Sequence, residues 1–116
     1  MSAKIIVIYP TPADAEEFER VYTEDHAPMV TTDTFPGITK FVQVKVLGTP
    51  DGSPPPIARI AELHFESIDD LKNAAGSPSA AGAVAHAFEI STGGPPTVLV
   101  TDDSVTNFAE SKSATN

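Results

Sequence analysis

The chain has 116 residues, of which 41% are hydrophobic and 20% are charged, a composition typical of one globular domain. Its net charge is −9, and because such a field repels nucleic-acid phosphates and anionic lipids, we expect neither nucleic-acid nor membrane binding. No cysteine is present, which excludes disulfides, thiolate metal sites and cysteine nucleophiles. We expect a cytoplasmic protein, since residues 1–4 lead directly into a strand-like segment without a signal sequence.

The first third of the chain predicts a strand and an amphipathic helix. Residues 4–9 are rich in β-branched side chains and end at Pro10, a pattern typical of a strand. Asp14 is suited to cap a helix, after which apolar residues recur at helical spacing: Phe18, Val21, Tyr22 and Met29. Pro28 lacks the N–H that would bond the carbonyl of Glu24, so the helix should end or kink near His26.

Three further segments are expected to be strands. Residues 38–47 alternate in polarity, and residues 57–65 are rich in apolar side chains. The proline-rich segment 48–56 cannot pair in a sheet and should join these two strands in an antiparallel arrangement. Residues 97–101 predict the last strand.

Two helical segments are expected between the third and fourth strands. Ser67 is suited to cap a short helix that Gly76 ends, and a second helix should begin after Ser77. A narrow stripe on this second helix is expected to pack on the sheet: Ala81, Val84, Ala85 and Phe88. His86 lies off the stripe and is expected to be exposed.

The resulting order, β-α-β-β-α-β, predicts an α+β ferredoxin-like sandwich in which the helices cover one face of a four-stranded antiparallel sheet. Residues 1–101 should form this domain. Residues 102–116 are mostly polar and should form a tail that is loose or lies on a partner.

The strands carry large apolar side chains on both faces. In the first strand, Ile6 and Ile8 point away from the face that Ile5, Val7 and Tyr9 share. Each such side chain contributes about 1.5–3 kcal/mol when buried, so one face left in water would be costly and adhesive. We therefore expect a homodimer in which two sheets meet face to face and close a β-barrel.

Several short motifs follow one another along nearly the whole expected domain. Tyr9 and Pro10 end the first strand, and Phe18, Tyr22 and His26 follow at intervals of four residues before a Pro-Met-Val segment. Further along lie a Gly-Ser-Pro-Pro-Pro segment at residues 52–56, a Leu-His-Phe-Glu-Ser segment at 63–67 and a Ser-Thr-Gly-Gly segment at 91–94. In this order they resemble the EthD family of dimeric α+β barrel proteins.

The resemblance implies a homodimeric barrel with a cleft between helices and sheet in each subunit. It also implies a link to bacterial ether degradation, from which the family takes its name. Similar dimeric barrels isomerise, cyclise, dehydrate or oxygenate small molecules or degrade haem, so the fold leaves the reaction open. Glu89 and Ile90 stand where family members often carry an asparagine and an aromatic residue, so no role is carried over to this pair.

His26 is the leading catalytic candidate. On a helical wheel it lies at the edge of the stripe formed by Phe18, Tyr22 and their apolar neighbours, from which it can face a cleft. Histidine titrates near neutral pH and suits proton transfer, with Tyr22 and Asp25 as possible supporting residues. The alternative is a partly buried histidine that caps the kinked end of the helix.

The expected cleft is apolar, and its predicted ligand-binding residues are Tyr9, Phe18, Met29, Phe41 and Arg59. His64 should face either a dimer interface or water. The three histidines show no metal-binding spacing, and no phosphate-binding loop follows a strand, so we expect neither a metal nor a cofactor.

Three functions remain open from the sequence. The first is a cofactor-independent enzyme of isomerase, lyase or monooxygenase type, acting by acid–base chemistry on an apolar or aromatic molecule. The second is a non-catalytic binding or accessory protein of an ether or aromatic degradation pathway. The third is a haem-binding protein that uses a histidine.

Overall fold

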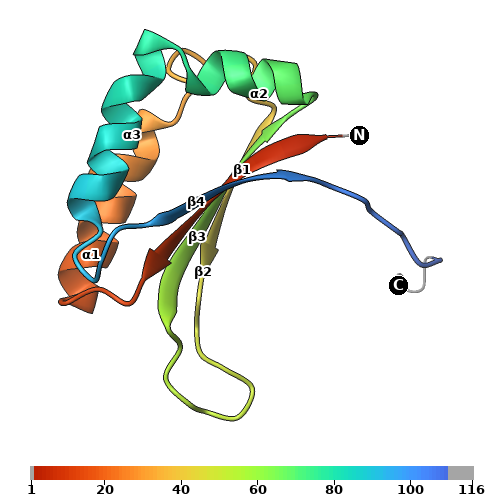
Figure 1. The fold of residues 1–116 in the computed structure, drawn as a ribbon. Helices are drawn as coiled ribbons and strands as arrows, with labels where there is room; N and C mark the ends of the chain where they lie inside the picture. The colour runs from red at the N-terminus through yellow and green to blue at the C-terminus, as the bar shows by residue number, and fades with distance from the viewer. Residues whose placement is uncertain (1, 110–116) are drawn as a thin grey trace.

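Four strands form one antiparallel sheet in the order β2-β3-β1-β4 in the computed structural model, which describes residues 2–109. The strands are β1 (Ala3–Pro10), β2 (Lys40–Lys45), β3 (Ile57–Phe65) and β4 (Thr97–Asp102). The helices gather on one side of this sheet (Figure 1). The predicted ferredoxin-like α+β class is confirmed.

The first helical segment changes its geometry twice before it ends. Helix α1 (Ala15–Val21) begins at Asp14, whose side chain accepts a hydrogen bond from the Glu17 amide at 3.1 Å. A π-helical turn, η1 (Tyr22–His26), follows, and a 3₁₀ turn, η2 (Ala27–Met29), completes the segment. Because Pro28 has no N–H, regular α-helical bonding cannot continue through this region. The π turn leaves both Tyr22 and His26 buried.

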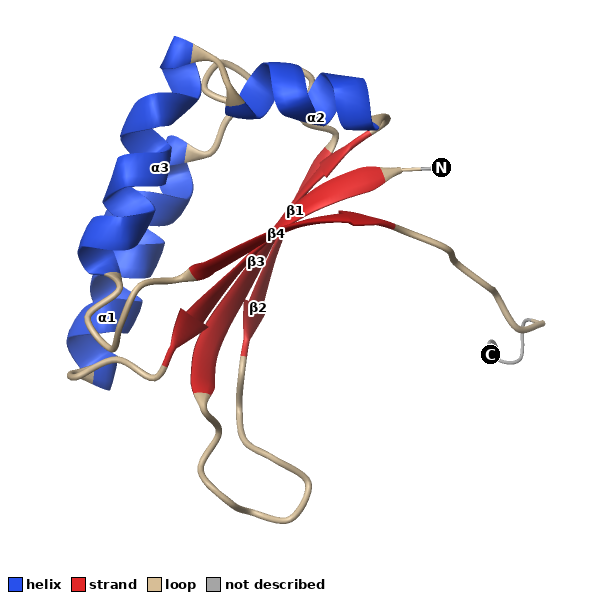
Figure 2. Cartoon of the chain, viewed as in Figure 1, coloured by secondary structure: helices blue, strands red, loops and turns tan. Residues whose placement is uncertain are grey.

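Two more helices complete the layer on the inner face of the sheet. Helix α2 (Ile68–Ala75) begins at Ser67, whose hydroxyl accepts a hydrogen bond from the Asp70 amide at 3.0 Å. Helix α3 (Pro78–Ile90) runs beside the first helical segment (Figure 2). The stripe predicted on α3 is wrong, since the helix is rotated and buries a different set: Ala80, Ala83, Ala87 and Ile90.

The strand register assigns each side chain to one face of the sheet. Ile5 pairs with Leu63 and Val100, and these residues face the helices. The outer face carries no helix and presents an apolar set: Ile6, Ile8, Val42, Val44, Ile60 and Leu99. Leu99 is 44% exposed.

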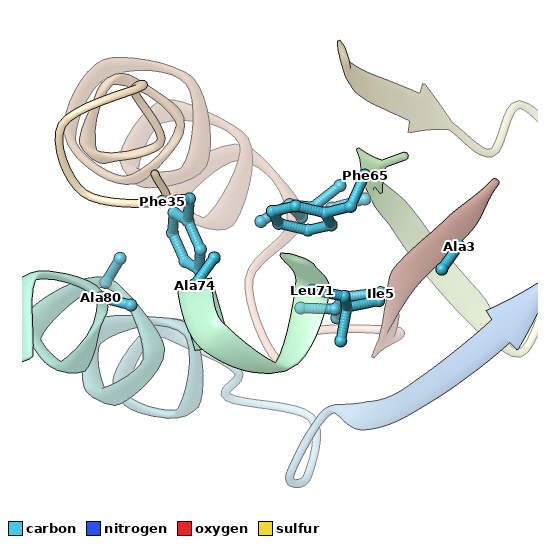
Figure 3. Packing of buried hydrophobic residues seen from close by; sticks show 10 residues of the cluster. Ala3, Ile5, Phe35, Phe65, Leu71, Ala74 and Ala80 are labelled. Carbon is cyan, nitrogen blue, oxygen red and sulfur yellow. The ribbon is translucent and has the colours of Figure 1, made fainter. Parts of the chain in front are cut away.

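The hydrophobic core consists of two clusters between the helices and the sheet. One joins the sheet to α2 and the start of α3 through Ile5, Phe35, Phe65 and Leu71 (Figure 3). The other is smaller and joins β1 to the first helical segment and the end of α3 through Tyr9, Phe18, Tyr22, Ala87 and Ile90.

Two segments extend beyond the sheet. The loop between β2 and β3 projects from one end, and residues 103–109 leave the other end after β4 (Figure 1). Val105 and Phe108 in this tail are 75% and 85% exposed. The remainder of the predicted tail, residues 110–116, lies outside the described residues.

Candidate functional site

A cavity of about 230 Å³ lies between the inner face of the sheet and the helices. Its walls come from both core clusters and are almost entirely aliphatic or aromatic, with Ile5, Val7 and Leu63 on the sheet side and Ala83 and Ala87 on the side of α3. Apart from Tyr9 and His26, the lining side chains are apolar, and none carries a formal charge. The cavity therefore suits a small neutral molecule, because burying an unpaired ion is costly.

The entrance lies between α3 and the edge strand β4. Val84, Phe88 and Val98 line the cavity and are also 44%, 48% and 48% exposed, so they form its rim. The rotation of α3 produces this arrangement, because its small alanines pack inward and its larger side chains reach the opening.

His26 occupies the polar end of the cavity with both ring nitrogens engaged. Its Nε2 lies 3.1 Å from the Tyr9 hydroxyl, and its Nδ1 lies 3.0 Å from Nδ1 of His86. Burial, followed by the influence of His86, lowers the pKa of His26 to about 4. The ring is therefore neutral at neutral pH and can accept a proton.

Tyr9 brings a hydroxyl into an otherwise apolar wall. The residue is 1% exposed, and burial, with a smaller contribution from Tyr22, raises its pKa well above the ordinary value of a phenol. Tyr9 accordingly keeps its proton near neutral pH. Its hydroxyl can donate to one partner and accept from another.

The three side chains can share their protons in two neutral arrangements. In one, Tyr9 donates to His26 and His26 donates to His86; in the other, both donations are reversed. Both arrangements satisfy the same two contacts. One pattern converts into the other when both protons shift along the row, Tyr9 takes up a proton at one end and His86 releases one at the other.

The predicted site residues fall into two groups. Tyr9, His26 and Phe41 line the cavity. Tyr22 and Phe18 instead pack behind Tyr9, with ring centroids 5.6 and 5.5 Å from the Tyr9 ring. Burial raises the pKa of Tyr22 to about 12, and among residues 2–109 its hydroxyl is the one buried side-chain polar atom without a hydrogen-bond partner.

Three other predicted residues do not line the cavity. Arg59 donates two hydrogen bonds to Glu19, at 2.9 and 2.7 Å, and its guanidinium lies 4.7 Å from the centroid of the Tyr22 ring. Asp25 is exposed, and Met29 packs against the larger core cluster. Arg59 is thus already committed to an ion pair and a stacking contact.

The histidines outside η1 differ in their surroundings. The prediction that His86 is exposed is wrong, because the rotation of α3 brings it, partly buried, onto His26. His64 lies on the outer sheet face, where its Nε2 is 3.0 Å from Glu62. No sequence spacing indicates the pairing of His26 and His86, which are 60 positions apart.

The part of the chain that the structure describes contains no group of three or more histidine or carboxylate side chains arranged to hold a metal ion. Both ring nitrogens of His26 already have partners, so binding of haem iron by His26 would have to displace one of them. Within residues 2–109, no helix has the length and hydropathy needed to cross a membrane.

Fold and site together define an α+β ferredoxin-like protein with an internal apolar cavity. The model of the EthD domain matches residues 10–87, and the chain belongs to the EthD family. An uncharacterized 11.0 kDa protein in the thcB-thcC intergenic region of Rhodococcus erythropolis is 32% identical over 100 residues, which cover 86% of this chain and 93% of that protein.

Solved structures share the fold. An ethyl tert-butyl ether D (EthD) family protein from Bacillus halodurans has a TM-score of 0.80 at 22% identity, covering 90% of this chain and all of that one (100%). A dimeric ferredoxin-like protein of unknown function from Bacteroides fragilis scores 0.61 at 14% identity, covering 88% and 96%. A hydroxynitrile lyase from Passiflora edulis scores 0.65 at 18% identity, covering 91% and 96%.

Proposed function

We propose that this protein is a small-molecule enzyme in which Tyr9 and His26 carry out acid–base chemistry on a neutral apolar or aromatic ligand. The observation that carries the proposal is the 3.1 Å contact between the Tyr9 hydroxyl and His26 Nε2 in the wall of an otherwise apolar cavity. The chemistry uses groups of the chain itself and calls for no cofactor.

Tyr9 is the group that would meet the ligand. Both ring nitrogens of His26 already have hydrogen-bond partners. If both contacts are kept, His26 can act on a ligand only through Tyr9. A carbonyl or hydroxyl oxygen of the ligand would accept a hydrogen bond from Tyr9 in one proton arrangement, and a ligand hydroxyl would donate one to Tyr9 in the other. His26 would accept the Tyr9 proton in one arrangement and donate a proton to Tyr9 in the other, and so would set the direction of transfer.

The ligand would be uncharged and would carry one polar group. The walls offer no cation to a carboxylate or phosphate, and Arg59 is held by Glu19 outside the cavity. An ion would therefore lose its hydration without a compensating partner. Aromatic ketones, aldehydes and alcohols match this description.

The reaction would remove or add a proton at a carbon atom next to a carbonyl group, or at a hydroxyl oxygen, as in isomerisation or in lyase chemistry. The hydroxynitrile lyase among the structural neighbours gives support at the level of the fold, since it shows that this architecture can accommodate an enzyme of that type.

We also propose that the protein is a homodimer closed through the outer sheet face. Six large apolar side chains occupy this face, and full burial of a side chain of this size contributes at most about 1.5–3 kcal/mol. A second sheet is the simplest complementary surface. The neighbour from Bacteroides fragilis supports the proposal, because it is a dimeric protein with the same fold.

Acetophenone is a suitable probe, because it is small, neutral and aromatic and has exchangeable protons beside a carbonyl group. We expect the protein to accelerate hydrogen–deuterium exchange at the methyl group of acetophenone in D₂O, followed by NMR. Tyr9→Phe should reduce this rate by about 100-fold or more, which is the lower range for acid–base catalysis, while the variant still binds the probe.

His26→Gln provides the companion measurement, and circular dichroism would check the folding of both variants. If acetophenone binds but wild-type exchange does not exceed that of Tyr9→Phe, proton transfer is contradicted and the binding or accessory function is favoured.

A further inference from the structure

We propose that His86 is the outer member of a proton relay that connects the cavity to solvent through His26 and Tyr9. The inference rests on the proposed function of Tyr9 and His26. It assigns a role to a histidine whose sequence position gives no indication of it.

Three elements supply one continuous hydrogen-bonded row. Tyr9 comes from β1, His26 from the π turn η1, and His86 from helix α3. The two contacts measure 3.1 and 3.0 Å, and the two imidazole rings lie with centroids 5.1 Å apart at an interplanar angle of 30°. Every gap in the row is therefore short enough for direct proton transfer.

The outer end of the row reaches water. His86 Nδ1 is used by His26, which leaves Nε2 as its second site for a proton. Within residues 2–109, the Tyr22 hydroxyl is the sole buried side-chain polar atom without a partner, and Nε2 of the partly buried His86 has no hydrogen bond to the protein. This nitrogen must therefore be accessible to solvent.

A relay answers a difficulty that the cavity creates. His26 is 6% exposed, so a proton that it takes up has no direct path to water. The row of three groups supplies such a path and returns each of its members to a neutral state.

The transfer balances proton by proton. The Tyr9 oxygen takes a proton from the ligand while its own proton moves to Nε2 of His26. The proton on Nδ1 of His26 moves to Nδ1 of His86, and the proton on Nε2 of His86 passes to water. Each of the three residues ends neutral and the ligand is left as an anion, to which the reverse sequence returns a proton taken from water.

A purely structural role for His86 would be to join α3 to η1. His86→Asn separates the two roles, because the asparagine amide can keep a hydrogen bond to Nδ1 of His26 but cannot pass a proton onward. His86→Phe fills the same space and removes both functions. Glu89→Gln, an exposed position on the same helix, is the matched control.

Two measurements test the relay. The first is acetophenone hydrogen–deuterium exchange, which we expect to fall at least tenfold in H86N and H86F with unchanged acetophenone affinity and to stay at the wild-type rate in E89Q. The second needs no ligand: exchange of the His26 ring proton with water, measured by NMR on ¹⁵N-histidine-labelled protein, should slow in the same two variants.

Wild-type rates for H86N in both measurements would overturn the relay while leaving the proposed function of Tyr9 and His26 intact. If the wild-type protein fails to exchange acetophenone, the proposed function fails, and the ring-proton measurement alone decides the relay. Loss of acetophenone binding in H86N with normal ring-proton exchange would assign His86 a structural role and would also reject the relay.

Discussion

His26 illustrates how surroundings determine the chemistry of a residue. A histidine in water has a pKa of 6.5, whereas His26 is 6% exposed and has a pKa of about 4. Burial is the larger cause, and His86 adds to it. The ring consequently serves as a neutral proton carrier near pH 7 rather than as a cation.

This shift in pKa predicts a dependence of stability on pH. Between pH 6.5 and about 4, the unfolded histidine binds a proton that the folded one does not, so stability falls as the pH falls. The stabilising contribution is complete above 6.5 and amounts to roughly 3 kcal/mol, which is lost on acidification through the folded pKa.

Urea denaturation at pH 7 and near pH 4 checks this expectation. From the higher to the lower pH, the wild-type protein should lose roughly 3 kcal/mol more than His26→Gln, which lacks the titrating ring. Equal losses in the two proteins would contradict the assignment of a buried neutral His26.

The sequence indicates some of the site residues but not their partnerships. His26 and Tyr9 could be identified from local patterns, because a helical stripe and a strand end determine which way they point. Asp25 shares the wheel position of the stripe, yet the π turn changes the helical geometry and the side chain is exposed. Arg59 could not be assigned, since its partner Glu19 lies 40 positions away.

At the scale of elements, helix α3 shows where pattern reasoning reaches its limit. Its sequence is alanine-rich, so more than one face satisfies the apolar spacing. Packing within the two core clusters selects the face with Ala80, Ala83 and Ala87 and places Val84 and Phe88 at the cavity rim. The same rotation carries His86 to His26, so both errors in the prediction have one cause.

Strand and helix boundaries could be predicted far better than the rotation of α3. Asp14, Ser67 and the proline-rich loop act through their nearest neighbours in the chain, and the structure places each where local chemistry requires. Rotation, in contrast, depends on contacts between distant elements.

The Ser-Thr-Gly-Gly segment that leads into β4 provides a test at this scale. A Cβ atom on Gly93 would lie 1.8 Å from the carbonyl oxygen of Thr11, and a backbone atom cannot move aside as a side chain can. Gly93→Ala should therefore lower the free energy of unfolding by about 1–3 kcal/mol or more.

Gly48→Ala is the matched control, because a Cβ there meets nothing within 4 Å. Thermal denaturation of both variants measures the difference. A melting temperature of Gly93→Ala equal to that of Gly48→Ala would show that the close approach of the two segments is wrong.

At the scale of the whole molecule, the outer sheet face determines assembly. Ile8 lies on this face beside Ile60, with Val44 next along the same row. Ile8→Lys places a charge that a second sheet would have to desolvate, so it should convert the dimer to a monomer. Sedimentation velocity at micromolar concentration measures this change.

Ile68→Lys controls for the added charge, because Ile68 is 37% exposed on α2, away from the outer face. This variant should sediment as the wild-type dimer. A monomeric wild-type protein would contradict closure through the sheet.

The central claim is that a ligand oxygen meets the Tyr9 hydroxyl inside the cavity, and carbon NMR of acetophenone labelled at its carbonyl tests this contact directly. A hydrogen bond donated by Tyr9 should move the bound carbonyl resonance downfield from that of the free ketone, and Tyr9→Phe should abolish the displacement while binding persists. The same bound resonance in wild-type protein and Tyr9→Phe would contradict the account.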